Sequence, residues 1–365
     1  MKPSHQTLLL SKKDIITIIN HFGVDNVMDE LIHRLEIAIS EYNPSNTDIP
    51  ARSGFNYNSP NPGLVEWMPV YQKGEEIVIK VVGYHPNNPK TYNLPTIIST
   101  ISTYDTSNGH LKSLMDGVLL TALRTGASTA VATKALAQSD SKTLGLIGCG
   151  AQAVTQLHAL CRDFDFETVL IFDVDEATMS SFDKRTEALN LNCIIVKSDI
   201  KNIVQSSDII CTATSIDVHA GPLFDNLETV PHVHINAVGS DFPGKVELPI
   251  SLLKSSKVIP DFYNQAIIEG ECQQLQKDDI YKDWVEILNN SAQYASLKGE
   301  STVFDSTGWA LEDYVVSKLF TEYATSIGAG SYIEIESLSS DVKNPYAFIS
   351  SAFSVEKAID LIKTS

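Results

Sequence analysis

The stretch LGLIGCGAQA, residues 144 to 153, decides the fold. An apolar run reaches Gly148, Gly150 and Ala153 in the pattern G-x-G-x-x-A, and a segment with helical spacing follows. A strand that turns into a helix through this pattern is typical of dinucleotide binding. The first glycine permits the tight turn, the second lets a pyrophosphate approach the backbone, and the helix N-terminus faces the phosphates. The predicted phosphate loop comprises Gly148, Gly150, Ala151 and Gln152.

A second apolar run, TVLIFD, ends in Asp173. A carboxylate at this place accepts hydrogen bonds from the adenosine ribose hydroxyls and repels a 2′-phosphate, which favours NAD over NADP. Two alternatives stay open from these residues alone. One is an S-adenosylmethionine enzyme, and the other is a degenerate nucleotide fold without hydride chemistry.

The alternation of strands and helices extends beyond this stretch. From Lys142 onward the strand-like runs are TLGLIG, TVLIFD, CIIV, DIICTAT and VHINAVG, with helical segments between them. This alternation predicts a parallel sheet built of βαβ units. After Glu312 we expect a helix, a strand-like SYIEI and a last helix from Ser354 to Lys363.

The part of the chain before Lys142 has a different pattern. Residues 11 to 41 have helical spacing, and residues 43 to 63, rich in Pro, Asn and Ser, predict a loop with one short strand. Three strand-like runs separated by turn residues predict an antiparallel sheet: Leu64 to Tyr71, Glu76 to Tyr84 and Thr96 to Asp105. Residues 111 to 137, rich in alanine and leucine, predict one long helix.

We therefore predict an α/β protein with two domains. Residues 126 to 315 form a Rossmann-type domain with a doubly wound parallel sheet. Residues 1 to 125, with about 316 to 365, form a mixed α+β domain.

Composition excludes several classes of partner. The 365 residues carry a net charge of −18, which argues against nucleic acid and against anionic membrane surfaces. No run approaches the 18 or more apolar residues of a membrane helix. The five cysteines form no CxxC pair and fit a reducing compartment, so the cytoplasm is the expected location. The nine histidines show no H-E-x-x-H, and we expect no metal.

Four charged residues of the first part are candidates for substrate chemistry. Lys80 lies inside the apolar run IVIKVVGY and Arg124 inside LLTALRTGA, so each needs an anion. With Arg52 they could clamp a carboxylate, and Glu66 could hold an amine. The alternative for each is a structural ion pair or a solvated strand residue.

The run HINAVGSDFPGKVEL, residues 234 to 248, places Asp241 just after a predicted strand. Ligands of open α/β sheets bind at the carboxyl ends of strands, so this carboxylate is a candidate acid/base. An Asx-turn or a helix N-cap would also explain it. Lys245 could balance Asp241 or a phosphate, or be a solvated loop lysine. Glu269 could approach the same crevice, although a solvated helix start explains it equally well.

Seven segments together resemble the ornithine cyclodeaminase/mu-crystallin family, from about residue 50 to 325. They are VEWMPV, KVVGYHPNNPKTYNLPT, MDGVLLTALRTGAST, LIGCGAQA, NAVGSDFPGKVEL, IEGECQQL and VFDSTGWALEDY. The run D-x-P-G-K-x-E-L from Asp241 to Leu248 resembles the true cyclodeaminases most closely. Ser240 and Phe242 depart from the family pattern, which often has glycine and cysteine at these positions.

The resemblance implies roles for these residues. Arg52, Lys80 and Arg124 would hold the substrate α-carboxylate, while Glu66 and Asp241 would face the amino groups. Asp241 would be the central catalytic acid/base, assisted by Lys80 and Glu66. The implied NAD site comprises Thr125, Gly148, Gly150, Ala151, Gln152, Asp173, Val238, Gly239 and Lys245. The mixed domain would bind the substrate and form a homodimer.

The activity implied by the resemblance is ornithine cyclodeamination. L-ornithine would become L-proline and ammonia by hydride transfer to bound NAD⁺, cyclisation of the imine and return of the hydride. Lysine cyclodeamination to pipecolate differs by only one methylene of the substrate. Two further alternatives are a net NAD(P)-dependent amino-acid dehydrogenase or ketimine reductase, and a non-catalytic ligand-binding protein.

Overall fold

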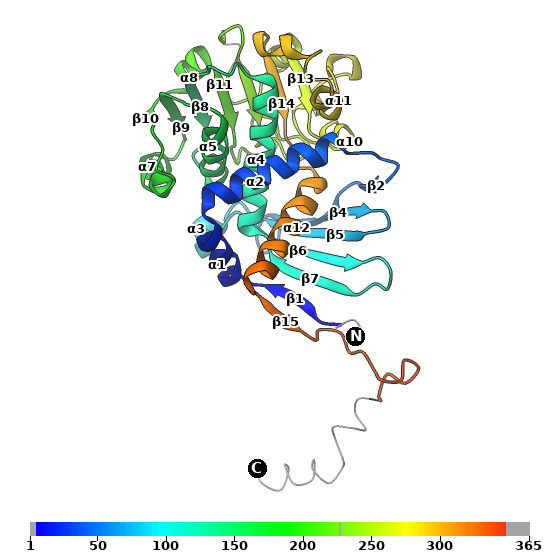
Figure 1. Cartoon of the computed structure of the whole chain (residues 1–365). Helices are drawn as coiled ribbons and strands as arrows, with labels where there is room; N and C mark the ends of the chain where they lie inside the picture. The colour runs from blue at the N-terminus through cyan, green and yellow to red at the C-terminus, as the bar shows by residue number, and fades with distance from the viewer. Residues whose placement is uncertain (1–4, 226–227, 348–365) are drawn as a thin grey trace.

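The computed structural model describes residues 5–225 and 228–347. Figure 1 shows two sheets, with the long helices α2 (Val24–Ser40), α4 (Val118–Leu136) and α12 (Ala310–Ile327) between them. Helix α4 contacts strands of both sheets. The α/β fold class predicted from the sequence is confirmed.

The first sheet consists of seven parallel strands in the order β10-β9-β8-β11-β12-β14-β13. Their bounds are β8 Thr143–Ile147, β9 Thr168–Phe172, β10 Ile194–Lys197, β11 Ile209–Thr212, β12 His234–Ala237, β13 Lys257–Pro260 and β14 Thr302–Asp305. The chain runs from β8 outward to β9 and β10, then returns to β11 on the other side of β8. Ligands of doubly wound sheets bind at such a reversal of strand order.

Short helices and 3₁₀ turns connect these strands. The helices are α5 Ala151–Asp163, α6 Glu176–Ser180, α7 Phe182–Thr186, α8 Ile200–Ser206, α9 Ile250–Ser255, α10 Tyr263–Ala266 and α11 Trp284–Asn289. The 3₁₀ turns are η1 Glu187–Leu189, η2 Glu271–Gln274, η3 Lys277–Asp279 and η4 Ala295–Gly299.

The second sheet is mixed, with the order β15-β1-β7-β6-β5-β4-β2 and β3 also paired with β4. Its strands are β1 Thr7–Leu10, β2 Thr47–Asp48, β3 Ser53–Tyr57, β4 Gly63–Gln72, β5 Glu76–Tyr84, β6 Ile97–Asp105, β7 Leu111–Asp116 and β15 Ser331–Ile333. Strands β4, β5 and β6 are antiparallel as predicted, whereas β1 and β7 are parallel. The short helix α3, Asn88–Tyr92, lies between β5 and β6.

Two predictions about the residues before Lys142 are corrected. Residues 111 to 137 are not one helix, because Leu111–Asp116 form strand β7, where Ser113 and Met115 are buried in alternation. Residues 11 to 41 are helical as their spacing indicates, in two helices, α1 (Lys12–Phe22) and α2, divided at Gly23, whose φ of +85° breaks the helix. The segment 43–63 contains two strands rather than one, and β1 was not predicted.

A shared hydrophobic core joins the two sheets. It runs from Leu8 on β1, through helices α2, α4 and α12, to Phe304 on β14. The predicted domain boundaries near residues 125 and 315 fall inside α4 and α12, so the division into domains stays a prediction. The predicted helix from Ser354 to Lys363 lies outside the described residues. Within residues 5–225 and 228–347, no helix is long and apolar enough to cross a membrane.

Candidate active site

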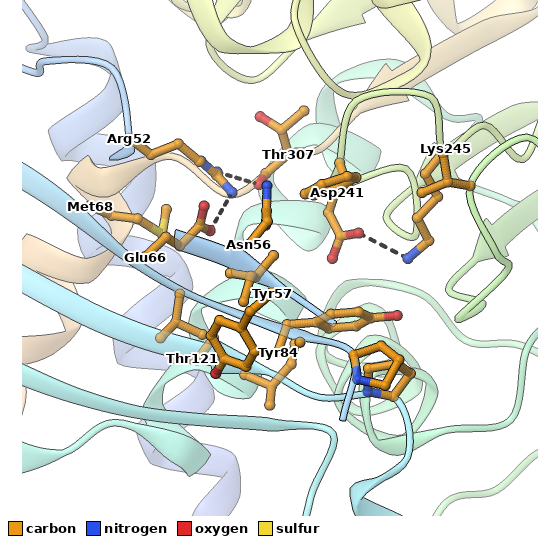
Figure 2. Close-up of a pocket in the computed structure, with 18 of the residues that line it drawn as sticks. Arg52, Asn56, Tyr57, Glu66, Met68, Tyr84, Thr121, Asp241, Lys245 and Thr307 are labelled. Carbon is orange, nitrogen blue, oxygen red and sulfur yellow. Dashed lines mark hydrogen bonds and ion pairs between the residues drawn. The ribbon is translucent and has the colours of Figure 1, made fainter. Parts of the chain in front are cut away.

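A cavity of about 280 Å³ lies between the mixed sheet and the carboxyl ends of the parallel strands. The structure brings all five predicted substrate residues to its wall: Arg52, Glu66, Lys80, Arg124 and Asp241. Figure 2 shows Arg52 and Glu66 on one side of this cavity, and Asp241 and Lys245 on the other. Tyr84, Thr121 and Thr307 also line it.

Lys80 is buried, with 1% of its surface exposed. Its Nζ lies 3.0 Å from Oδ1 and 2.9 Å from Oδ2 of Asp313 on α12. Burial, together with the charge of Arg124, lowers the pKa of Lys80 from its ordinary value of 10.5 to about 8, although Asp313 opposes this shift. The ammonium is therefore positive at neutral pH and loses its proton in mildly alkaline solution.

Arg124 lies beside Lys80 and is buried as well. Its Nη1 pairs with Glu312, and its Nε lies 3.3 Å from Oδ1 of Asp313. Glu312 also accepts a hydrogen bond from Ser128 Oγ at 2.7 Å. Gly308, with φ +86°, allows this packing, because an added Cβ would lie 2.7 Å from Arg124 Nη1. The predicted need of both cations for anions is thus met by two adjacent acids of α12.

Burial of Glu312 disfavours the ionised form of its carboxyl group. Burial raises the pKa of this carboxyl to about 7, although the charge of Arg124 lowers it. Glu312 and Asp313 were not predicted as site residues. The signal for them was the acidic pair in the apolar helix ALEDYVV, since buried charges need partners of opposite sign.

Arg52 connects the mixed sheet with the segment that follows β14. Its Nη1 donates to Glu66 Oε1 at 3.2 Å, and its Nη2 donates to the carbonyls of Thr307 and Gly308 at 2.8 and 3.0 Å. Its Nε lies 2.9 Å from Oε1 of Glu269. Burial raises the pKa of Glu66, whereas the charges of Arg52 and Lys80 lower it.

Asp241 and Lys245 form an ion pair on the opposite wall. Lys245 Nζ lies 2.9 Å from Asp241 Oδ1 and 5.5 Å from the centre of the Tyr84 ring (Figure 2). Burial alone would lower the pKa of Lys245, but the charge and hydrogen bond of Asp241, together with Tyr84 and Glu247, raise the pKa to about 12. Lys245 is 4% exposed, which excludes a solvated loop lysine.

The loop that carries Asp241 is anchored by Glu247, the glutamate of the D-x-P-G-K-x-E-L run. This buried carboxylate accepts hydrogen bonds from Thr212 Oγ1 at 2.6 Å, Thr214 N at 2.7 Å and Gly239 N at 2.9 Å. A Cβ added to Gly239 would lie 2.2 Å from Glu247 Oε1, so a side chain here would displace the Glu247 carboxylate. Ser240 Oγ donates to the Lys245 carbonyl at 2.6 Å and closes the loop.

The predicted phosphate loop fits a dinucleotide. Gly148 has a φ of +94°, and a Cβ there would lie 2.6 Å from the carbonyl oxygen of Ala213. The space beside Gly150 is open, and this residue precedes the first turn of α5 without a side-chain cap. The helix N-terminus thus offers free N–H groups to a pyrophosphate. Cys149 N donates to Asp173 Oδ2 at 2.8 Å, which places this carboxylate beside the loop.

Two of the remaining predicted cofactor residues lie at the same edge of the sheet, and a third lies on helix α4. Val238 and Gly239 follow β12, and Thr125 is buried on α4 with its hydroxyl donating to the Thr121 carbonyl at 2.9 Å. Their contact with a cofactor stays a prediction. Arg185, which was not predicted, donates to the Cys149 carbonyl at 2.7 Å and so supports the glycine loop.

Comparison with curated proteins finds relatives that cover two thirds or more of the chain. L-lysine cyclodeaminase of Streptomyces rapamycinicus is 37% identical over 343 residues, which cover 94% of this chain and 99% of that protein. Ornithine cyclodeaminase of Agrobacterium fabrum is 33% identical over 252 residues, which cover 69% of this chain and 70% of that protein.

Comparison with solved structures gives the same fold. A lysine cyclodeaminase structure that describes recognition of L-lysine, L-ornithine and L-2,4-diaminobutyric acid has a TM-score of 0.90 and 41% identity, covering 94% of this chain and 99% of that one. An archaeal alanine dehydrogenase dimer with bound NAD has a TM-score of 0.76 and 29% identity, covering 91% and 100%. The model of the ornithine cyclodeaminase/mu-crystallin family matches residues 12–327. The chain belongs to the ornithine cyclodeaminase/mu-crystallin family, which confirms the resemblance found in the sequence.

Proposed function

We propose that this chain is an NAD-dependent cyclodeaminase that converts an α,ω-diamino acid into a cyclic imino acid and ammonia. One observation carries the proposal. Three cations and two carboxylates, Arg52, Lys80, Arg124, Glu66 and Asp241, line one cavity at the carboxyl ends of the parallel strands. An amino acid with one carboxylate and two ammonium groups complements this set of charges.

The substrate is proposed to be L-lysine first and L-ornithine second. The sequence alone favoured L-ornithine, but the relative that aligns over 94% of this chain is an L-lysine cyclodeaminase. A pocket discriminates one methylene by only about 1 to 3 kcal/mol. We therefore expect both diamino acids to react, giving pipecolate and proline.

The substrate carboxylate is proposed to bind Lys80, Arg124 and Arg52. Each cation is already backed by an acidic residue, namely Asp313, Glu312 or Glu269. When ionised, the acids compensate the buried positive charge before the substrate arrives, and the cations can then accept a further anion in the cavity.

Asp241 is proposed to be the base that takes a proton from the α-ammonium. A protonated amine cannot release hydride from its carbon, so this step precedes the redox chemistry. The ion pair with Lys245 holds the Asp241 carboxylate beside the cavity. When bound, NAD⁺ supplies a temporary acceptor for the α-hydrogen, which leaves and returns as hydride. Glu66, whose pKa is raised by burial, is proposed to take the proton of the second amino group before that group attacks the α-carbon.

We further propose a homodimer through the outer face of the mixed sheet. Trp67 and Val81 are paired across β4 and β5 and are exposed, with Phe55 and Ile98 on the same face. The Phe55 and Trp67 rings lie 5.8 Å apart. An apolar sheet face of this kind marks an interaction site. Light scattering should give twice the chain mass, and a Trp67→Glu/Val81→Glu variant should be monomeric.

A cytoplasmic location is also proposed. It is supported by the five cysteines, which are all free thiols, as is typical of a reducing compartment. Cell fractionation tests it, and recovery of the protein outside the cytoplasm would contradict it.

The test of the function is product analysis with L-lysine or L-ornithine and a trace of NAD⁺. We expect cyclic imino acid and ammonia in equal amounts, far exceeding the NAD⁺ added, without lasting NADH. Steady NADH formation without cyclic product would make the chain a net dehydrogenase, the principal alternative. Absence of reaction with both diamino acids would refute the cyclodeaminase proposal.

A further inference from the structure

Glu269 is a buried carboxylate beside the cavity, although it is not one of the residues that line it. It follows helix α10, and its side chain is 6% exposed. Its Oε1 lies 2.9 Å from Arg52 Nε. Within the described part of the chain, neither atom has a hydrogen-bond partner, so the contact acts through charge.

Arg52 therefore lies between two carboxylates. Glu66 contacts Nη1 from the cavity wall, and Glu269 contacts Nε from outside the cavity. Arg52 belongs to no helix or strand, so these contacts and the two carbonyls at Nη2 determine where the guanidinium lies. Glu269, in direct contact with Nε, offers a negative charge that opposes the attraction toward Glu66, and the more distant Asp261 also interacts with Arg52 through charge.

We propose that Glu269 is a positioning residue that, when ionised, draws Arg52 away from Glu66 and keeps its guanidinium available for the substrate carboxylate. This inference rests on the proposed function, in which Arg52 binds that carboxylate and Glu66 faces an amino group. Without a negative charge at position 269, Arg52 pairs more tightly with Glu66. The guanidinium of Arg52 is then less available to the substrate carboxylate, and the carboxylate of Glu66 is less available to an amino group.

The surroundings of Glu269 make this action depend on pH. Burial raises the pKa of Glu269 to about 8, although the charge of Arg52 opposes the shift. The other charged groups that act on it are Glu66 on β4, Asp241 after β12 and Asp261 after β13, and all three raise its pKa further. The carboxyl is neutral well below pH 8 and ionised above it, so the proposed effect on Arg52 grows as the pH rises.

The experiment compares the parent chain with Glu269→Gln, which keeps the shape of the side chain but cannot ionise. The KM for L-lysine is measured from pH 6.5 to pH 9. Both proteins retain Lys80, whose titration in the same range cancels in the ratio of their KM values. We expect the KM of the Gln variant to equal that of the parent at pH 6.5 and to be roughly tenfold higher at pH 9. The kcat of the variant should differ from the parent's by less than twofold. Glu36→Gln, which removes an exposed carboxylate paired with Lys134, is the matched control and should give a ratio near one throughout.

A second background separates positioning from a general structural effect. In an Arg52→Met chain, Glu269→Gln should change KM no further at any pH. If the Gln variant does not fold, Glu269→Asp replaces it and should retain the parent's pH dependence of KM.

Three results would overturn the inference: a ratio that does not change with pH, an effect that persists in the Arg52→Met chain, or an Asp variant without the parent's pH dependence. A parent chain that forms no cyclic imino acid would instead refute the proposed function, and this inference with it.

Discussion

Replacing Asp313 by Asn tests how the buried cations of the cavity are held. Asp313 is fully buried, lies 2.9 Å from Lys80 Nζ and 3.3 Å from Arg124 Nε, and has nearly the shape of asparagine. The change therefore removes a charge and leaves the packing intact. Removing one partner of a buried ion pair costs about 3 to 5 kcal/mol, because the other charge is left uncompensated.

Lys80 can reduce this cost by losing its proton. Its pKa in the folded chain is about 8, below the ordinary value of 10.5, and Asp313 is one of the groups that raise it. The folded variant thus binds fewer protons than the folded parent near pH 7, while the unfolded chains bind equally many. Stability must then rise more steeply with pH in the variant. We expect a deficit of about 3 kcal/mol or more in the free energy of unfolding at pH 7, and a smaller deficit at pH 9.

Urea unfolding followed by tryptophan fluorescence measures both values, since Trp284 and Trp309 are buried. Asp165→Asn is the control, because that carboxylate is 92% exposed and lies 3.8 Å from Lys142 Nζ. A deficit below about 1 kcal/mol at pH 7, or one that widens toward pH 9, would refute the reasoning.

Three further predictions concern the catalytic base, its loop and the cofactor. Asp241→Asn should lower kcat by about 100-fold or more with NAD⁺ affinity unchanged in calorimetry, and near-normal turnover would remove Asp241 from the mechanism. Gly239→Ala should lower the melting temperature by several degrees, because the added Cβ would lie 2.2 Å from Glu247 Oε1. The control Gly299→Ala, with open space around the added Cβ, should leave the melting temperature unchanged, and equal melting temperatures of the two variants would contradict this account. Asp173→Ser should weaken NAD⁺ binding and strengthen NADP⁺ binding in the same calorimetric assay, and an unchanged ratio of the two affinities would exclude its role in cofactor choice.

Much of the parallel sheet could be predicted from the sequence, because each of its features is local. The glycines at 148 and 150 follow an apolar strand directly, and the strands near them are short apolar runs. Strand β7 was missed because LKSLMD leads without a turn signal into an alanine-rich helix, and only pairing with β6 shows its alternation. Strand β1 depends on distant partners, β7 and β15, which local patterns do not reveal.

In the candidate site, too, some residues could be identified from local sequence and others only from the fold. Lys80 and Arg124 were identified because charges inside apolar runs need partners. Their partners Glu312 and Asp313 were not identified. Glu312 lies 188 positions after Arg124 and Asp313 lies 233 positions after Lys80, and only the packing of α12 on α4 and β5 brings them close. For Lys245, spacing alone could not distinguish an ion pair from a solvated lysine, and the folded loop resolves it.

The central claim is that the α-hydrogen leaves the substrate and returns to the same carbon during cyclisation. L-lysine deuterated at C2, incubated with the protein and a trace of unlabelled NAD⁺, tests it by mass spectrometry and NMR of the product. The account predicts pipecolate that retains deuterium at C2 through many turnovers. Pipecolate with hydrogen from solvent at C2, or deuterium accumulating in reduced cofactor, would contradict it.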